Sequence, residues 1–143
     1  MFSLIITIIS IALVAALAIA TLYYGGSAFS QGTAKAKAAT VVNHGQQITG
    51  ANTLYANDFS GNYATTIAQL TAGSYLASEP KSGVSAASYA LGTTTTNVVT
   101  LASVPDEVCK KINVQANLGD TVTPTGADNA QFSCTSGAFT FKG

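Results

Sequence analysis

Charged side chains are scarce in this sequence. Six basic and six acidic residues among 143 make up 8% of the chain and leave a formal net charge of zero, whereas an ordinary soluble domain carries about a quarter charged residues. The basic residues form only two close pairs, Lys35 with Lys37 and Lys110 with Lys111. Binding to nucleic acid depends on a basic patch that neutralises phosphates, so we expect no nucleic-acid partner.

Groups that could perform catalysis are also few. The only histidine is His44, and the only adjacent carboxylates are Asp106 and Glu107. Metal-ligand spacings, phosphate-binding glycine loops and nucleophile motifs are missing. We interpret His44 as a surface residue on a helix, and Asp106–Glu107 as solvated charge or helix N-terminal charge ahead of Cys109. The sequence predicts no catalytic, cofactor-binding or metal site, and a protein that is not an enzyme.

The apolar residues are concentrated at the start. Residues 1–24 contain no charge, no Pro and no Gly, and only Ser3, Thr7, Ser10 and Thr21 interrupt the run. As a helix it would rise about 36 Å, at about 1.5 Å per residue, which exceeds a hydrocarbon core of roughly 30 Å. This run predicts a membrane-spanning helix.

A cleaved signal peptide is the alternative interpretation. Such peptides have a basic segment and an apolar core of about 7–15 residues. Here the first basic residue is Lys35 and the run is longer, although Ala18-Ile19-Ala20 imitates a cleavage site. An apolar beginning instead suggests that a basic leader once preceded Met1 and was removed. We then expect residues 58 onward to lie outside the membrane.

The chain is long enough for one small domain and one further element. We predict an apolar helix at 1–28 and a globular domain at 29–143, with Gly25 and Gly26 as a break in the helix. The helix resumes at 29–56 as an amphipathic half. One face of that half would carry Ala34, Ala38, Val41, Ile48 and Tyr55.

The remainder predicts a short helix at 64–77 followed by an antiparallel sheet at 84–143. β-branched and small polar residues dominate this sheet region, and Gly and Pro divide it. The candidate strands are Val84–Leu91, Thr94–Val104, Lys111–Leu118 and Ala138–Lys142. A sheet of about three to five strands would cover the amphipathic helix half, which gives an α+β fold.

The two cysteines, Cys109 and Cys134, lie in the part expected outside the membrane. If they are bridged, they close a loop of about 25 residues and constrain the unfolded chain by roughly 3 kcal/mol. The alternative is two unpaired buried thiols, as in cytosolic proteins.

The arrangement as a whole resembles a type IV pilin. It combines an apolar N-terminal helix, an amphipathic continuation, a sheet and a late pair of cysteines, over nearly the whole chain. Details similar to the type IVb branch are Met1 as a first mature residue, the segment Ala68–Leu76, and Val104-Pro105-Asp106-Glu107-Val108-Cys109 before Cys134.

The resemblance implies a structural subunit. A prepilin peptidase would remove a basic leader and leave Met1 as the processed, often methylated N-terminus. The subunit would wait in the inner membrane, and the pilus assembly machinery would build identical copies into an extracellular helical filament. Cys109–Cys134 would then bound the C-terminal loop. The filament core would be packed by Leu4, Ile5, Ile6, Ile8, Ile9, Ile11, Leu13, Val14, Leu17, Ile19 and Leu22.

One residue departs from the family pattern. Most members have Glu at the position of Ile5, where it pairs with the amine of a neighbouring subunit. With Ile5 there, register must come from apolar packing, with hydroxyls such as those of Ser3 or Thr7 as further contacts. Some minor subunits also lack the Glu, so the alternatives are a minor pilin or tip adhesin, and a bitopic membrane accessory protein.

Overall fold

A computed structural model describes all 143 residues. The chain divides into two units, Met1–Thr33 and Ala34–Gly143, which are described separately. We call the second unit the head. The helix α1 (Phe2–Asp58) begins in the first unit and ends in the head.

The predicted helix break at Gly25 and Gly26 is not present. Both residues lie within α1, and neither has a positive φ. A glycine with helical backbone angles keeps its place in the hydrogen-bond ladder, so it costs about 1 kcal/mol relative to Ala without interrupting the helix.

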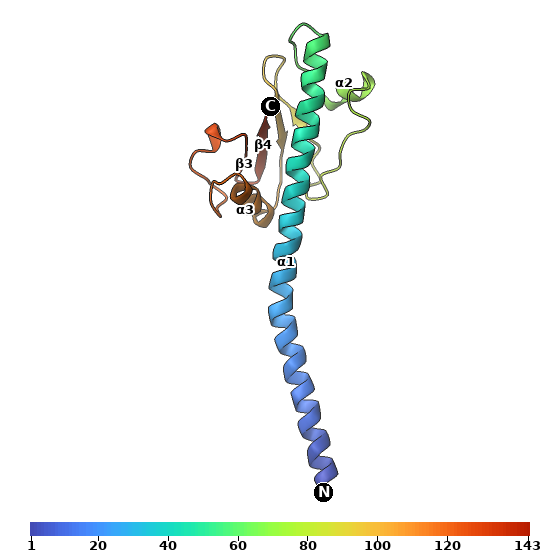
Figure 1. Cartoon of the computed structure of the whole chain (residues 1–143), viewed down its shortest axis with the longest axis vertical. Coiled ribbons are helices and arrows are strands. Elements are labelled where there is room, and N and C mark those ends of the chain that lie inside the picture. The colour runs from blue at the N-terminus through green and yellow to red at the C-terminus, as the bar shows by residue number, and fades with distance from the viewer. The chain divides into compact units, whose positions relative to one another are not determined.

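In the head, α1 packs on a small antiparallel sheet (Figure 1). The buried apolar side of the helix includes Ala34, Ala38, Val41 and Ile48, as the sequence predicted, while Tyr55 is half-buried. The same helix also buries Gly45, Thr49 and Asn52. The predicted α+β architecture, a long N-terminal helix on a small sheet, is therefore confirmed.

The sheet has four strands in the order β1-β2-β4-β3, all paired antiparallel. The strands are β1 (Ala90–Leu91), β2 (Val98–Leu101), β3 (Phe132–Thr135) and β4 (Ala138–Lys142). Val99 and Leu101 of β2 alternate with more exposed neighbours and pair with Phe141 and Phe139 of β4. These four side chains form the apolar face of the sheet, and all are at most 2% exposed.

Gly45 sets how closely α1 approaches this face. A Cβ at this position would lie 3.0 Å from the ring of Phe141, which is itself buried. A contact that short is tighter than ordinary packing. The backbone of α1 at Gly45 therefore packs directly against the ring of Phe141 in the sheet.

The predicted strand at Lys111–Leu118 is wrong, because the chain is helical as far as Gln115 and forms a turn after it. α3 spans Asp106–Gln115, follows Pro105, and has Asp106 and Glu107 in its first turn. The β-branched residues of this segment suggested a strand. Val108 and Ile112 are instead spaced four apart and both buried, so helical spacing decided the outcome.

Three other boundaries also differ from the prediction. The helix expected at 64–77 shortens to α2 (Ile67–Ala72), which begins after Thr66 in a capping box with Gln69 and is followed by Gly73 as its C-cap. Of the strand expected at 84–91, only the two residues of β1 pair in the sheet. Of the strand expected at 94–104, only the four residues of β2 do so. The β4 prediction is confirmed at both ends, whereas β3 and the short helix η1 (Ala127–Asn129) were not predicted.

Cys109 of α3 and Cys134 of β3 are joined by a disulfide with a Cα–Cα distance of 5.2 Å. Both residues are fully buried, and no free cysteine remains. The pairing expected from the sequence is therefore present, and it ties α3 to the strand beside it (Figure 1).

Candidate assembly surface

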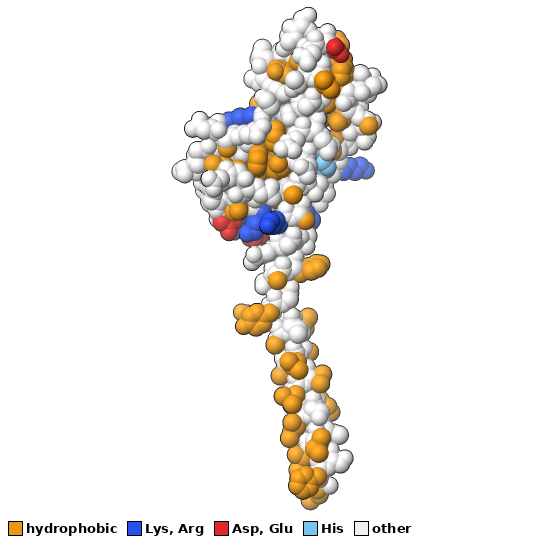
Figure 2. Space-filling view, viewed as in Figure 1, with side chains coloured by type: hydrophobic (Ala, Val, Ile, Leu, Met, Phe, Trp, Pro, Cys, Tyr) orange, Lys and Arg blue, Asp and Glu red, His pale blue; other side chains and the backbone are white.

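The first unit presents a continuous apolar surface. Every residue from Met1 to Thr33 is exposed, and hydrophobic side chains follow the helix along its length (Figure 2). This stretch of α1 is long and apolar enough to cross a membrane, and the span contains no buried residue. A core helix of a soluble domain would be covered by its own chain, so that explanation does not apply.

The residues predicted to pack a filament core all lie on this surface. Their exposed fractions run from 53% at Ile5 and Ile9 to 77% at Leu22. Burying a side chain of this size contributes about 1.5–3 kcal/mol relative to leaving it in water. The unit is therefore compatible with a surrounding of lipid or of other apolar helices.

Three of the four hydroxyl groups in the apolar run bond back to the helix itself. Each of these hydroxyl groups donates to a backbone carbonyl three or four residues earlier. The bonds run from Thr7 to Leu4 at 2.8 Å, from Ser10 to Ile6 at 2.8 Å and from Thr21 to Ala18 at 2.9 Å. A hydroxyl bonded back to its own helix can enter an apolar environment without losing a hydrogen bond.

These polar interruptions are not scattered around the helix. At about 3.6 residues per turn, a series of nine mostly small residues falls within a sector of about 80° on one side, while other small residues, among them Ala12, Ala16 and Ala20, lie elsewhere around the helix. We call this side the small-residue face, and it consists of Ser3, Thr7, Ser10, Val14, Ala18, Thr21, Gly25, Ala28 and Gly32. A shallow groove runs along part of it, with Ser10, Val14 and Ala18 in its lining.

Sequence reasoning treated Ser3, Thr7, Ser10 and Thr21 as interruptions and Gly25 as a break, placed Val14 among the core-packing residues, and did not identify the face. The signal was their recurrence at spacings of three and four. The structure adds that a Cβ at Gly25 or Gly32 would meet nothing within 4 Å. Packing inside this chain therefore does not require either glycine.

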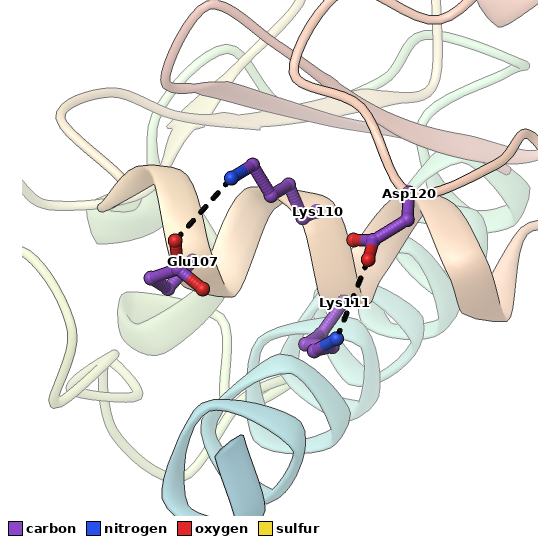
Figure 3. Close-up of polar contacts among 4 residues, drawn as sticks. All are labelled: Glu107, Lys110, Lys111 and Asp120. Carbon is purple, nitrogen blue, oxygen red and sulfur yellow. Dashed lines mark hydrogen bonds and ion pairs between the residues drawn. The ribbon is translucent and has the colours of Figure 1, made fainter. Parts of the chain in front are cut away.

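The lysines of α3 are paired within the chain (Figure 3). Lys110 Nζ lies 3.3 Å from Glu107 Oε1, and Lys111 Nζ lies 3.7 Å from Asp120 Oδ2. Both pairs reach solvent, where such contacts contribute at most about 1 kcal/mol. Neither lysine is thus an isolated charge that depends on a neighbouring subunit for its partner.

His44 is half-buried rather than fully at the surface as expected. Its Nδ1 lies 3.1 Å from the hydroxyl of Tyr89, and the two rings meet edge to face. Burial lowers the pKa of His44 below its ordinary value. Burial also raises the pKa of Tyr89 to about 12, so the phenol stays protonated at neutral pH. The pair joins α1 to the segment that leads into β1.

No group of three or more His, Cys, Asp or Glu residues comes together in the structure. Comparison of the chain with models of known protein families, with curated proteins and with solved structures finds no match. The exposed apolar surface of the first unit is therefore the feature of this structure that points most directly to a function.

Proposed function

We propose that this protein is a structural subunit that polymerises through its apolar N-terminal helix into an extracellular filament of the type IV pilin kind. The observation that carries the proposal is a helix, apolar over residues 1–24, whose side chains the chain itself leaves exposed. The head supplies a folded, disulfide-tied domain for the filament exterior. Before assembly the helix lies in the inner membrane.

Moving such a helix from lipid into a filament gives little hydrophobic gain, because lipid tails are as apolar as leucine. Association then depends on close van der Waals packing, which small residues permit. The small-residue face supports this step, since Gly25 and Gly32 leave room that no part of this chain uses. Packing along this face would also align neighbouring subunits without the Glu that most family members have at the position of Ile5.

The test is to shear cells that express the protein, pellet the sheared fraction, and examine it by negative-stain electron microscopy. Mass spectrometry then identifies its main protein. We expect thin filaments composed mainly of this chain, with the Cys109–Cys134 disulfide intact. A matched strain without the gene should yield no such filaments.

Ile5 favours a second candidate, a minor or tip subunit, because some minor pilins lack the Glu of the family. In that case the chain would be a trace component of filaments built from another protein. Recovery of the chain only in the membrane fraction would contradict both proposals and leave a bitopic accessory protein.

A further inference from the structure

The strand β3 lies at one edge of the sheet, where it pairs with β4 on one side only. In an antiparallel pair, alternate residues direct their N–H and C=O groups toward the partner strand. The carbonyl of Gln131 accepts a hydrogen bond from the Lys142 N–H of β4, whereas the backbone of Cys134 bonds away from β4. The outer edge of β3 is therefore presented at Phe132 and Cys134, and the next outward N–H, that of Ser136, donates to the Val122 carbonyl at 2.8 Å.

The side chain of Asn113 occupies the place that another strand would take. The Cys134 N–H donates to Asn113 Oδ1 at 2.8 Å, and Asn113 Nδ2 donates back to the Cys134 carbonyl at 2.7 Å. Two neighbouring strands exchange the same pair of bonds. The second hydrogen of Nδ2 goes to the Thr121 carbonyl at 2.7 Å, so both N–H groups and the oxygen of this fully buried amide have partners.

The disulfide holds this amide in place. Asn113 lies one helical turn beyond Cys109, so both side chains leave α3 on the same side. Cys134 is consequently bound to α3 through its sulfur, its N–H and its carbonyl.

The strand beneath the cover is short, but it lacks two other features that normally prevent edge pairing. The sequence Gln131-Phe132-Ser133-Cys134-Thr135-Ser136 contains no charge and no proline. Charged side chains and prolines are the usual protections of an exposed edge. Two copies of β3 would meet antiparallel without repulsion between like charges.

We propose that α3 is a removable cover on the outer edge of β3, and that its release lets β3 pair with the β3 strand of a second copy. The cover is weaker in a chain whose thiols have not yet formed the disulfide, since α3 is then held by the Asn113 amide, by apolar packing and by the solvent-exposed Lys111–Asp120 pair. Formation of the disulfide thus closes an edge that would otherwise join heads to one another. The inference concerns the head alone and does not depend on the proposed filament.

The first test compares the full chain in detergent micelles with its Cys109→Ser/Cys134→Ser variant by residue-resolved hydrogen exchange. We expect exchange at the amide of residue 134 to accelerate about tenfold or more, a factor typical of one lost hydrogen bond, while β2 amides keep their rates. The disulfide-intact Asn113→Leu variant should show the same local change. A uniform rise across all strands, or no change at residue 134, would overturn the proposal.

The second test detects the pairing itself. In the Cys109→Ser/Cys134→Ser background, Thr135→Cys places an exposed thiol on β3, and Thr95→Cys places one on a distant exposed turn. A short bis-maleimide should join two copies about tenfold faster at position 135 than at 95. Because both variants share the same N-terminal helix, association through that helix affects them equally. Equal rates at the two positions would refute edge pairing.

Discussion

The side-chain amide of Asn113 exchanges two hydrogen bonds with the backbone of Cys134, one in each direction. Replacing Asn113 by Ala would leave the N–H and carbonyl of Cys134 unpaired in a buried site, whereas the Thr121 carbonyl is only partly buried and can bond to water. For the two groups of Cys134, at about 1–3 kcal/mol each, we expect a loss of about 2–6 kcal/mol in the free energy of unfolding. Denaturant unfolding of the detergent-solubilised chain measures this loss. Gln115→Ala, at an exposed position of the same helix, should change it little.

Gly45 and Gly50 give a matched pair of substitutions on α1. Gly50→Ala meets open space, so it should stabilise the head by up to about 1 kcal/mol through helix propensity. Gly45→Ala gains the same propensity but presses on the ring of Phe141, and overpacking costs about 1–3 kcal/mol. Thermal unfolding of the two variants should therefore place Gly45→Ala below Gly50→Ala. Equal melting temperatures would show that the approach of helix to sheet is looser.

Acid should weaken the head through His44. Its pKa in the folded state lies below 6.5, so the unfolded state binds the proton more readily. The stability contributed by the neutral imidazole is present above pH 6.5 and is lost as the pH falls from there through the lower folded-state pKa. Denaturant midpoints measured from pH 8 to pH 5 should decline over this window, and less so in His44→Gln. Parallel profiles for the two proteins would contradict this assignment.

The small-residue face can be tested with one substitution at two positions. Ala18 lies on the face, and Ala16 lies nearly opposite, yet both are exposed alanines in the same helix. Ala18→Leu should block the close approach of a second helix and sharply lower filament yield, whereas Ala16→Leu should leave it largely unchanged. Filament mass in the sheared fraction is the measurement, with membrane-fraction protein as the expression control. If Ala16→Leu proves the more damaging change, assembly uses another side of the helix.

The Lys111–Asp120 pair should contribute little. Lys111→Met retains the apolar stem of the side chain and removes only the charge, so the expected loss is under about 1 kcal/mol. Addition of salt should reduce the difference further, because the pair reaches solvent. A larger loss that persists at high salt would mean that the ion pair is effectively buried.

Much of the helical framework could be predicted from local pattern. The uncharged run at 1–24 and the apolar spacing of Ala34, Ala38, Val41 and Ile48 are periodic over many residues, and both were found in α1. The small-residue face is equally a sequence property, because its spacing alone defines it. It was missed because Ser3, Thr7 and Gly25 were considered one at a time.

The residues around the disulfide show where local pattern fails. Ile112 and Val114 are typical of strands, but Val108, Cys109 and Ile112 become helical because that spacing buries all three against the rest of the head. β3 could not be foreseen, since its four residues become a strand only by pairing with β4.

The sequence by itself determined that an apolar helix precedes a domain with an amphipathic helix and a final strand, because periodicity and composition act over neighbouring residues. Only the tertiary structure decided that Asn113 covers the edge of β3 and that Gly45 meets Phe141. Asn113 and Cys134 are 21 positions apart in the sequence, and Gly45 and Phe141 lie on different elements. Both contacts depend on how separate elements pack in the folded head. No local pattern encodes that meeting, because it follows from the packing of the whole head.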